Sequence, residues 1–267
     1  MLQPVTHDIP ESTKMKLGDF FTQVSRASTR ALLLDYDGTL APFQEERSRA
    51  LPYPKVPELL KKISRTGTRV VIATGRPAHE AALLLQGLTV EIWGSHGLER
   101  LQCDGSYELA KLDPRVVRRL SQVNDLLLEE GLGRLLEIKP GGTAVHWRGL
   151  ASTIRVRGLV QRVWSSLSSR EGLRLMTFDG GMEIRASART KRDVVRTLLS
   201  EMPKGASLAY LGDDQTDEDA FAALQGFGLS VLVKETYRPT VADVWIRPPQ
   251  GLIAFLSDWA KACGGNS

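Results

Sequence analysis

The sequence feature that most constrains the fold is a regular alternation of short apolar runs with segments of helical periodicity. The apolar runs at residues 31–34, 69–73 and 90–93 end in Asp-Tyr-Asp-Gly, Thr-Gly-Arg-Pro and Gly-Ser-His-Gly. Between them, residues 56–63 and 78–85 carry apolar side chains at helical spacing. Short continuous apolar runs are typical of strands buried on both faces. Strands that alternate with helices predict an α/β fold with a parallel sheet, and its site is expected where the strands end.

This alternation is interrupted in the middle of the chain. A helix opened by Pro114 and a different series of segments are expected there, at residues 134–139, 143–148, 153–167, 173–178 and 182–185. The links Pro-Gly-Gly at 140–142 and Asp-Gly-Gly at 179–181 are hairpin-like and favour antiparallel strands. The first pattern then returns, with segments at 190–199, 208–211, 218–224, 229–233 and 244–246. The expected organisation is a lead-in at 1–28, a Rossmann-like core at 29–105 and 186–267, and an inserted α+β domain at 106–185.

The composition is that of an ordinary globular protein. Of 267 residues, 42% are apolar and 25% are charged, which excludes a disordered or collagen-like chain. The 35 basic and 31 acidic residues are scattered, so nucleic-acid binding is not expected. No apolar run approaches the roughly 18 residues of a membrane span, no signal peptide is recognisable, and the two cysteines form no metal motif. We expect a cytoplasmic monomer that binds neither nucleic acid nor a membrane.

Two aspartates follow the first predicted strand. Asp35 and Asp37 are separated by one residue, so they point to the same side if the strand continues, while Gly38 permits a turn. Like charges this close repel unless a cation lies between them, and Mg²⁺ prefers oxygen ligands. These residues are therefore candidates for a magnesium site, and a solvated turn is the alternative.

A second acidic cluster, in Gly-Asp-Asp-Gln-Thr-Asp-Glu-Asp, follows a later predicted strand. Five acidic residues in seven positions are costly beside another acidic turn unless a metal is shared. Asp213, with Asp214 or Asp217, is expected to face the ion. Glu218 and Asp219 fit the start of a helix instead.

Two further places suit a phosphate group. Thr74 and Gly75, followed by Arg76, offer a hydroxyl and backbone N–H groups at a predicted helix start, where anions bind. Lys191 lies on the helix that leads back into the core, although a lysine on a helix surface is usually solvated. Together with the two acidic turns, these groups are the parts that phosphoryl transfer needs, because that chemistry rests mostly on charge neutralisation and positioning.

These motifs resemble those of a known superfamily. In chain order, Asp-Tyr-Asp-Gly-Thr-Leu, Ala-Thr-Gly-Arg, Lys191 and Gly-Asp-Asp-Gln-Thr-Asp-Glu-Asp-Ala-Phe are similar to the four motifs of the haloacid dehalogenase (HAD) superfamily of aspartyl-phosphate phosphatases. More narrowly, Gly-Ser-His-Gly-Leu-Glu, Val-His-Trp-Arg and Glu-Ile-Arg resemble segments of the trehalose-6-phosphate phosphatase family. The resemblance implies a HAD-type parallel-sheet core with an inserted α+β cap.

The resemblance also implies a role for each matching core residue. Asp35 is implied as the nucleophile that becomes an aspartyl-phosphate, and Asp37 as the general acid and base. The cofactor Mg²⁺ is implied to bind Asp35, the backbone carbonyl of Asp37, and Asp213. The supporting residues implied are Asp214 and Asp217 around the metal, and Thr74, Gly75 and Lys191 at the phosphoryl oxygens.

The lysine motif departs from the family pattern. The family usually has Asn-Lys-Gly there, whereas Lys191 stands in Ala-Arg-Thr-Lys-Arg. Lys191 has the expected position before a helix, and Arg189 and Arg192 are close alternatives for the same role.

The predicted strands of the inserted domain place polar side chains on one face, because successive side chains alternate between the faces of a sheet. The residues expected to bind substrate on that face are Lys139, His146, Arg148, Glu183 and Arg185, beside Glu137. A polar lid suits a hydroxyl-rich sugar and excludes water, and a merely solvated face is the alternative. Arg76 and His96 are expected to join them where cap and core meet, with a loop histidine that binds no ligand as the alternative for His96.

The resemblance implies an enzyme that hydrolyses trehalose 6-phosphate to trehalose and phosphate. A phosphatase for sucrose 6-phosphate or mannosyl-3-phosphoglycerate is the alternative in the same superfamily, since such enzymes differ mainly in the cap. A response-regulator receiver also gathers aspartates, threonine and lysine on a parallel sheet, but it lacks an acid/base residue such as Asp37. A sugar-phosphate sensor without activity is a third reading, although all the groups that catalysis needs are present.

Overall fold

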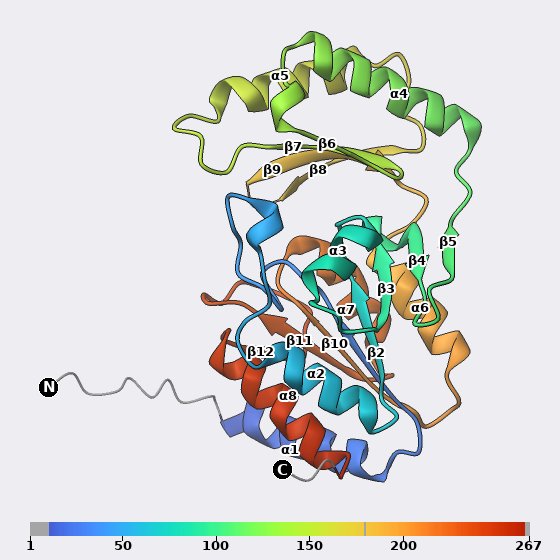
Figure 1. Ribbon diagram of the computed structural model, residues 1–267, viewed down its shortest axis with the longest axis vertical. Helices are drawn as coiled ribbons and strands as arrows, with labels where there is room; N and C mark the ends of the chain where they lie inside the picture. Colours follow the sequence, from blue (N-terminus) through green and yellow to red (C-terminus); the bar gives the residue numbers. More distant parts are fainter. Residues whose placement is uncertain (1–10, 179, 265–267) are drawn as a thin grey trace, which may run out of the picture.

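Two β-sheets with their helices stack one above the other (Figure 1). The computed structural model describes residues 11–178 and 180–264. Within these residues, a main sheet of eight strands carries helices on both faces, and a sheet of four strands carries helices on its far face. The smaller sheet, called the cap sheet below, turns its bare face toward the ends of the parallel strands.

The main sheet is mostly parallel, with the strand order β12-β11-β10-β1-β2-β3-β4-β5. Its strands are β1 (Arg30–Leu34), β2 (Arg69–Ala73), β3 (Glu91–Gly94), β4 (Glu99–Leu101), β5 (Tyr107–Leu109), β10 (Ser207–Gly212), β11 (Leu229–Val233) and β12 (Val244–Ile246). The pairs from β12 to β3 are parallel, and β4 and β5 continue the sheet antiparallel. Parallel pairing aligns the ends of β1, β2 and β10, so Asp35, Thr74 and Asp213 follow neighbouring strands at one edge.

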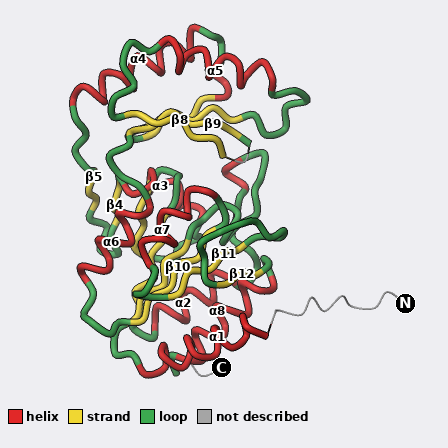
Figure 2. Tube along the Cα trace, turned by 180° about the vertical axis from the view of Figure 1, so that it is seen from behind, coloured by secondary structure: helices red, strands yellow, loops and turns green. Residues whose placement is uncertain are grey.

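Helices cover both faces of the main sheet because its central strands are apolar on both faces. In β1, Leu32 and Leu34 pack on one side, and Ala31 and Leu33 pack on the other. The first side is covered by α1 (Glu11–Arg26), α2 (Val56–Arg65), α3 (Ala78–Leu84) and α8 (Gln250–Ala262), and the second by α6 (Lys191–Glu201) and α7 (Glu218–Leu224). Figure 2 shows this arrangement from behind. None of the helices in the described residues has the length and apolar character that crossing a bilayer requires.

The cap sheet is antiparallel, with the order β6-β7-β9-β8. Its strands are β6 (Leu136–Lys139), β7 (Gly142–His146), β8 (Leu173–Phe178) and β9 (Gly181–Ala186), and its helices are α4 (Pro114–Glu129) and α5 (Ile154–Ser166). Val145 and Ile184 point to the helices and pack in one cluster with Val123 of α4. The two predicted Gly-Gly hairpins join β6 to β7 and β8 to β9. Asp179 of the second hairpin lies outside the described residues.

The structure confirms the predicted fold class, an α/β core with a mostly parallel sheet and a separate antiparallel cap sheet. Five strand or helix predictions agree to the residue, at 69–73, 173–178, 218–224, 229–233 and 244–246. The segments at 69–73 and 229–233 are buried almost throughout, which is why the sequence marks them as short, mostly apolar runs.

Four elements, α1, α8, β4 and β5, were not expected from the sequence. The helix α1 lies within the expected lead-in, whose residues 1–10 are outside the described part, and it buries Phe20 and Val24 in the core. Because β5 pairs with β4, the main sheet extends to Leu109, past the expected start of the cap at residue 106. β5 has only three residues, and all three side chains are exposed, so neither its length nor its burial marks it in the sequence.

Candidate active site

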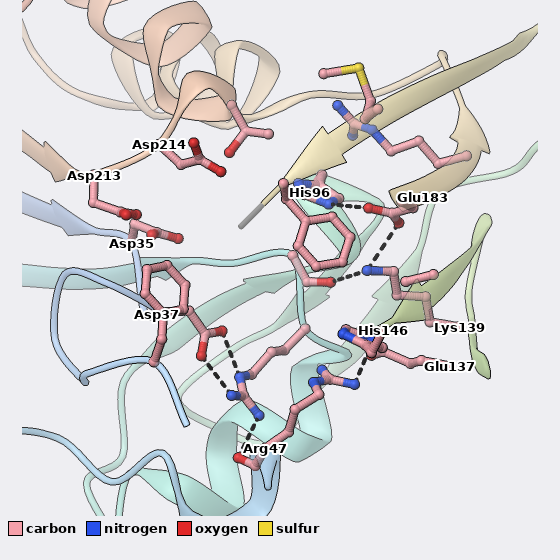
Figure 3. A pocket seen from close by; sticks show the side chains of 18 of the residues that line it. Asp35, Asp37, Arg47, His96, Glu137, Lys139, His146, Glu183, Asp213 and Asp214 are labelled. Atoms are coloured by element: carbon pink, nitrogen blue, oxygen red, sulfur yellow. Dashed lines mark hydrogen bonds and ion pairs between the residues drawn. The ribbon is translucent and has the colours of Figure 1, made fainter. Parts of the chain in front are cut away.

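A cavity lies between the ends of the parallel strands and the bare face of the cap sheet (Figure 3). Most of the predicted site residues line it: Asp35, Asp37, Gly75, Arg76, His96, Lys139, His146, Arg148, Glu183, Arg185, Lys191, Asp213 and Asp214. Thr74 and Asp217 are buried behind the lining and hydrogen-bond to it. The fold thus brings together nearly all of the residues that the sequence singled out.

Asp35 and Lys191 form a buried ion pair at the core end of this cavity. The backbone N–H of Asp35, just after β1, donates to the carbonyl of Leu211 in β10. Lys191 Nζ lies 2.5 Å from Asp35 Oδ1 and 2.7 Å from Asp217 Oδ1. Burial raises the pKa of Asp35 to about 7, although the charge of Lys191 opposes that rise. Burial alone would lower the pKa of Lys191, but the two carboxylates raise it above its ordinary value.

Lys191, and neither of its two arginine neighbours, reaches the site. A capping box of Thr190 and Asp193 begins α6 at this point and places Lys191 in the first, buried turn. Arg192 pairs with Asp219 at 2.6 Å, and Arg189 does not line the cavity. The position before a helix therefore identified the residue despite the unusual motif around it.

Three buried carboxylates gather beside Lys191. One oxygen each from Asp35, Asp213 and Asp217 lies within 4.8 Å of the others. Both oxygens of Asp217 are already used: Oδ1 accepts from Lys191 and from the Tyr210 hydroxyl, and Oδ2 accepts two backbone N–H groups. Asp213 differs, because its buried Oδ1 has no partner. Burial and the neighbouring carboxylates raise the pKa of Asp213 well above its ordinary value.

This set of donors fits a divalent cation. An unpaired buried carboxylate beside a second carboxylate is costly, and hard divalent cations take such oxygens as ligands. The backbone approaches closely as well, because a Cβ on Gly38 would overlap the carboxylate of Asp213. Asp35 and Asp213 therefore form a buried cluster consistent with a metal site, and Asp217 holds the lysine and the adjoining loop in place.

Asp37 is held by Arg76. The Nε and Nη2 atoms of Arg76 lie 2.7 and 2.6 Å from the two carboxylate oxygens of Asp37, and such paired bonds fix the plane of a carboxylate. The sequence predicts substrate binding by Arg76, but its guanidinium is committed to Asp37 and, through Nη1, to the carbonyl of Arg47 at 3.1 Å. The hydroxyl of Thr74 accepts the backbone N–H of Arg76 at 3.1 Å and so supports this turn. Phosphate binding by Thr74 stays a prediction.

A second group of charges joins the core to the cap sheet. Nε2 of His96 lies 3.0 Å from Glu183 Oε2, and Lys139 Nζ lies 2.9 Å from Glu183 Oε1 and 2.7 Å from the carbonyl of Gly75. Burial and the charge of Arg185 lower the pKa of His96 to about 4, against the effect of Glu183. Burial alone would raise the pKa of Glu183, but Lys139 and His96 hold it below its ordinary value. His96 is therefore neutral at pH 7 and Glu183 is ionised.

A third group surrounds Glu137 of β6. Its Oε2 lies 2.8 Å from His146 Nε2 and 2.6 Å from Nη1 of Arg47, which comes from the core. Burial opposes ionisation, but these neighbours and Lys139 lower the pKa of Glu137 to about 2. The guanidinium of Arg148 stacks over the ring of Phe43, another core residue, at 4.6 Å. The cap thus contacts the core through several charged side chains.

Polar atoms without a partner concentrate in this cavity. Among the described residues, the buried side-chain atoms that lack one are Thr39 Oγ1, His96 Nδ1, Glu137 Oε1, Arg185 Nε and Asp213 Oδ1. All but the first belong to residues that line the cavity. An unpaired buried polar group costs about 1–3 kcal/mol, so their concentration indicates a polar ligand that completes these bonds.

Sequence reasoning missed Phe43 and Arg47, which line the cavity, and Lys234, whose Nζ lies 3.5 Å from Asp213 Oδ2. The first two lie in the long segment between β1 and α2, where no periodicity or motif marks single residues. Lys234 directly follows β11, so the rule that polar residues after parallel strands gather at one edge could have found it.

The fold and the site together define the class of protein. The C-terminal domain of Candida albicans trehalose-6-phosphate phosphatase superposes with a TM-score of 0.77 at 20% identity, over 92% of this chain and 96% of that one. A haloacid dehalogenase-like hydrolase from Bacillus subtilis gives 0.60 at 15% identity, over 86% and 99%. These likenesses establish the fold, which is that of the HAD superfamily.

The trehalose-phosphatase family model matches residues 33–243, and the chain belongs to that family. A trehalose-phosphate phosphatase of Mycobacterium marinum is 31% identical over 245 residues, which are 86% of this chain and 61% of that protein. A probable trehalose-phosphate phosphatase C of Arabidopsis thaliana is 26% identical over 91% of this chain and 81% of its own length. A bifunctional trehalose-6-phosphate synthase/phosphatase of Thermoproteus tenax is 29% identical over 87% of this chain. The matched region makes up only 32% of that longer protein.

Proposed function

We propose that this protein hydrolyses trehalose 6-phosphate to trehalose and phosphate with the help of Mg²⁺. The observation that carries the proposal is one cavity with two chemically different ends. The core end holds Asp35, Lys191 and Asp213 in a buried cluster suited to phosphoryl transfer. The cap end holds buried polar atoms without partners, on Glu137 and Arg185, that suit the hydroxyls of a sugar.

In the first step, an oxygen of Asp35 attacks phosphorus, and the bond from phosphorus to the sugar oxygen breaks. Asp37 gives a proton to that leaving oxygen, and the sugar departs as a neutral alcohol. Lys191, whose Nζ lies 2.5 Å from Asp35 Oδ1, favours the ionised form of the nucleophile and neutralises the transferred group. The product of this step is an aspartyl-phosphate on Asp35.

In the second step, water attacks the phosphorus of the aspartyl-phosphate while Asp37 takes the proton of that water. The bond from phosphorus to Asp35 breaks, phosphate leaves, and Asp35 returns to its carboxylate form. A bound Mg²⁺, held by Asp35, Asp213 and the backbone carbonyl of Asp37, would supply positive charge opposite the phosphoryl oxygens. The unpartnered Oδ1 of Asp213 is the feature of this chain that supports it.

The cap residues support a sugar substrate in preference to a small ester. Glu137 and Glu183 are ionised acceptors, and Lys139 and Arg185 are donors, all on the face of the cap sheet that lines the cavity. Paired acceptors and donors of this kind match a disaccharide with many hydroxyls. Covering the reacting phosphate with such a lid also excludes water that would compete in the first step.

The proposal is tested by phosphate release from a panel of esters in the presence of Mg²⁺. The panel contains trehalose 6-phosphate, sucrose 6-phosphate, mannosyl-3-phosphoglycerate, glucose 6-phosphate and 4-nitrophenyl phosphate. We expect the highest kcat/KM for trehalose 6-phosphate. A clear preference for sucrose 6-phosphate or mannosyl-3-phosphoglycerate would overturn the substrate and keep the reaction, whereas no release from any ester would overturn both.

A further inference from the structure

A continuous line of contacts runs from the cap sheet to Asp37 (Figure 3). His146 and Arg47 both bind Oε2 of Glu137, at 2.8 and 2.6 Å. The backbone carbonyl of Arg47 accepts from Nη1 of Arg76 at 3.1 Å, and Arg76 donates hydrogen bonds to both carboxylate oxygens of Asp37. Arg47, a residue of the core, thus contacts the cap through its side chain and Arg76 through its backbone carbonyl.

The segment that carries Arg47 is anchored to the cap more than once. Arg47 begins the short 3-10 helix η1 (Arg47–Arg49), at the top of a loop that rises from the core toward the cap sheet (Figure 1). Nη1 of Arg148 in the cap lies 3.3 Å from the carbonyl of Gln44, and the Arg148 guanidinium stacks on Phe43. No residue of η1 is buried, but Ala50, which follows it, lies in the core, and its N–H donates to the Arg47 carbonyl at 3.2 Å. The turn is thus held from the core side by Ala50 and from the cap side by Glu137 and Arg148.

The ion pair between Arg47 and Glu137 is more buried than a typical surface salt bridge. Glu137 is 10% exposed and Arg47 is 26% exposed, so water screens the pair only in part. A second carboxylate, Glu80, lies 3.6 Å from the other side of the guanidinium. Because Arg47 and His146 share Oε2, the other oxygen of Glu137, a residue that lines the cavity, is left without a partner. A ligand hydroxyl bound there would be linked to Asp37 through Arg47 and Arg76.

We propose that Arg47 is a positioning residue that couples the cap to the orientation of Asp37. The proposal rests on the proposed function, since it assumes that Asp37 gives a proton to the leaving oxygen. With the Arg47 side chain bound to Glu137, the Arg47 carbonyl stays within reach of Arg76, and Arg76 holds the Asp37 carboxylate in one plane. Without the anchor, the carbonyl moves with its loop, and Asp37 meets the leaving oxygen in the right orientation less often.

The test uses two aryl esters without a sugar, so that sugar binding by Glu137 does not enter. 4-Nitrophenyl phosphate has a leaving group that departs without a proton, whereas phenyl phosphate depends more on the general acid. We compare kcat/KM of both esters for the wild type, Arg47→Ala, Arg47→Lys and Glu137→Gln. Arg49→Ala is the matched control, because Arg49 lies on the same turn, is 77% exposed and pairs with Glu46 of that loop.

We expect Arg47→Ala to lower kcat/KM for phenyl phosphate about tenfold more than for 4-nitrophenyl phosphate, within the range that general acid catalysis contributes. Arg47→Lys should restore part of this difference because it keeps a positive charge opposite Glu137. Glu137→Gln should change the ratio of the two kcat/KM values in the same direction. The double variant with Arg47→Ala should change it little further, since both substitutions break the same line of contacts. Arg49→Ala should leave the ratio as in the wild type.

An equal loss on both esters, or no loss on either, would overturn the coupling, because a merely structural role does not depend on the leaving group. If Arg47→Ala does not fold, Arg47→Lys and Glu137→Gln give the same comparison. A wild type that hydrolyses both aryl esters while these ratios stay constant would refute the inference alone. A wild type that releases phosphate from no ester would refute the proposed function itself.

Discussion

The two ends of the cavity use buried charge in different ways. At the core end, Lys191 binds Asp35 and Asp217, and the oxygens of Asp217 are all occupied, so these three side chains are fixed before any ligand binds. The unpaired oxygen at this end, on Asp213, suits a cation. At the cap end, Glu137 has one occupied and one unpaired oxygen. In the proposed function, the charges at the core end serve the reaction, and those at the cap end serve recognition of the sugar. Substitutions at the core end should therefore lower turnover of every ester, whereas substitutions at the cap end should mainly change the preference among substrates.

The largest expected effect is at the core end, from Asp35→Asn. Without a carboxylate nucleophile, turnover of every ester should fall by at least about a thousandfold. The fold should survive, because asparagine keeps the shape and removes a charge that Asp213 repels. Phosphate release and thermal unfolding of the variant measure the two effects. Substantial remaining activity on trehalose 6-phosphate and aryl esters alike would mean that no aspartyl-phosphate forms on Asp35.

The second expected effect is from metal removal, which also acts at the core end. Chelation should lower turnover of sugar and aryl esters together by about a hundredfold or more, and added Mg²⁺ should restore it. The physical reason is the unpaired oxygen of Asp213 beside Asp35, which needs a cation. The measurement is phosphate release before and after dialysis against a chelator. Full activity of protein shown by elemental analysis to be metal-free would contradict the expectation.

Glu183→Ala should produce a smaller effect, and an unequal one, at the cap end. It removes an ionised acceptor and leaves Lys139 and His96 without their shared partner. We expect kcat/KM for trehalose 6-phosphate to fall about thirtyfold, or about 2 kcal/mol, and that for 4-nitrophenyl phosphate to fall much less. Glu171→Ala on the outside of the cap, where the side chain is 81% exposed, is the control. Equal losses of kcat/KM on both esters would mean that this end of the cavity does not recognise the sugar.

The comparison of the two ends also shows what a sequence can reveal. Asp35 and Asp213 were predictable because each directly follows an apolar strand, and parallel pairing brings such positions to one edge. The polar face of the cap sheet was predictable from simple alternation, as Glu183 and Arg185 illustrate. What alternation cannot supply is how two separate sheets meet, and so the contact of Arg47 with the cap had no local signal.

The commitment of Arg76 to Asp37 was beyond the sequence for the same reason. The Thr-Gly-Arg motif follows β2 and indicates an anion site, and it does not say which anion the arginine meets. Only the stacking of the turn after β2 against the turn after β1 makes Asp37 the partner. Short strands with exposed side chains, such as β5, and helices with few buried positions, such as α1, were missed because their stability comes from tertiary packing.

The last expected effect concerns stability and leaves turnover aside: it is a pH dependence of unfolding that comes from the charges between core and cap. The pKa of His96 is lowered from 6.5 to about 4, so between these values the unfolded chain binds a proton that the folded protein does not. Stability therefore falls as the pH is lowered through this window, by up to about 3 kcal/mol for this group. The lowered pKa of Glu183 acts in the same direction, with its contribution present above pH 4.5 and lost below it.

His96→Asn should accordingly flatten the fall of the unfolding temperature between pH 6.5 and 4, even if it lowers that temperature at pH 7 by weakening the contact with Glu183. His79→Asn is the matched control, because His79 is exposed on α3 and stacks on Tyr107 away from the cap contacts. Thermal unfolding of the three proteins across this pH range measures the slopes. An unchanged slope in His96→Asn would show that the buried histidine between core and cap takes up its proton in the folded state as readily as in the unfolded chain.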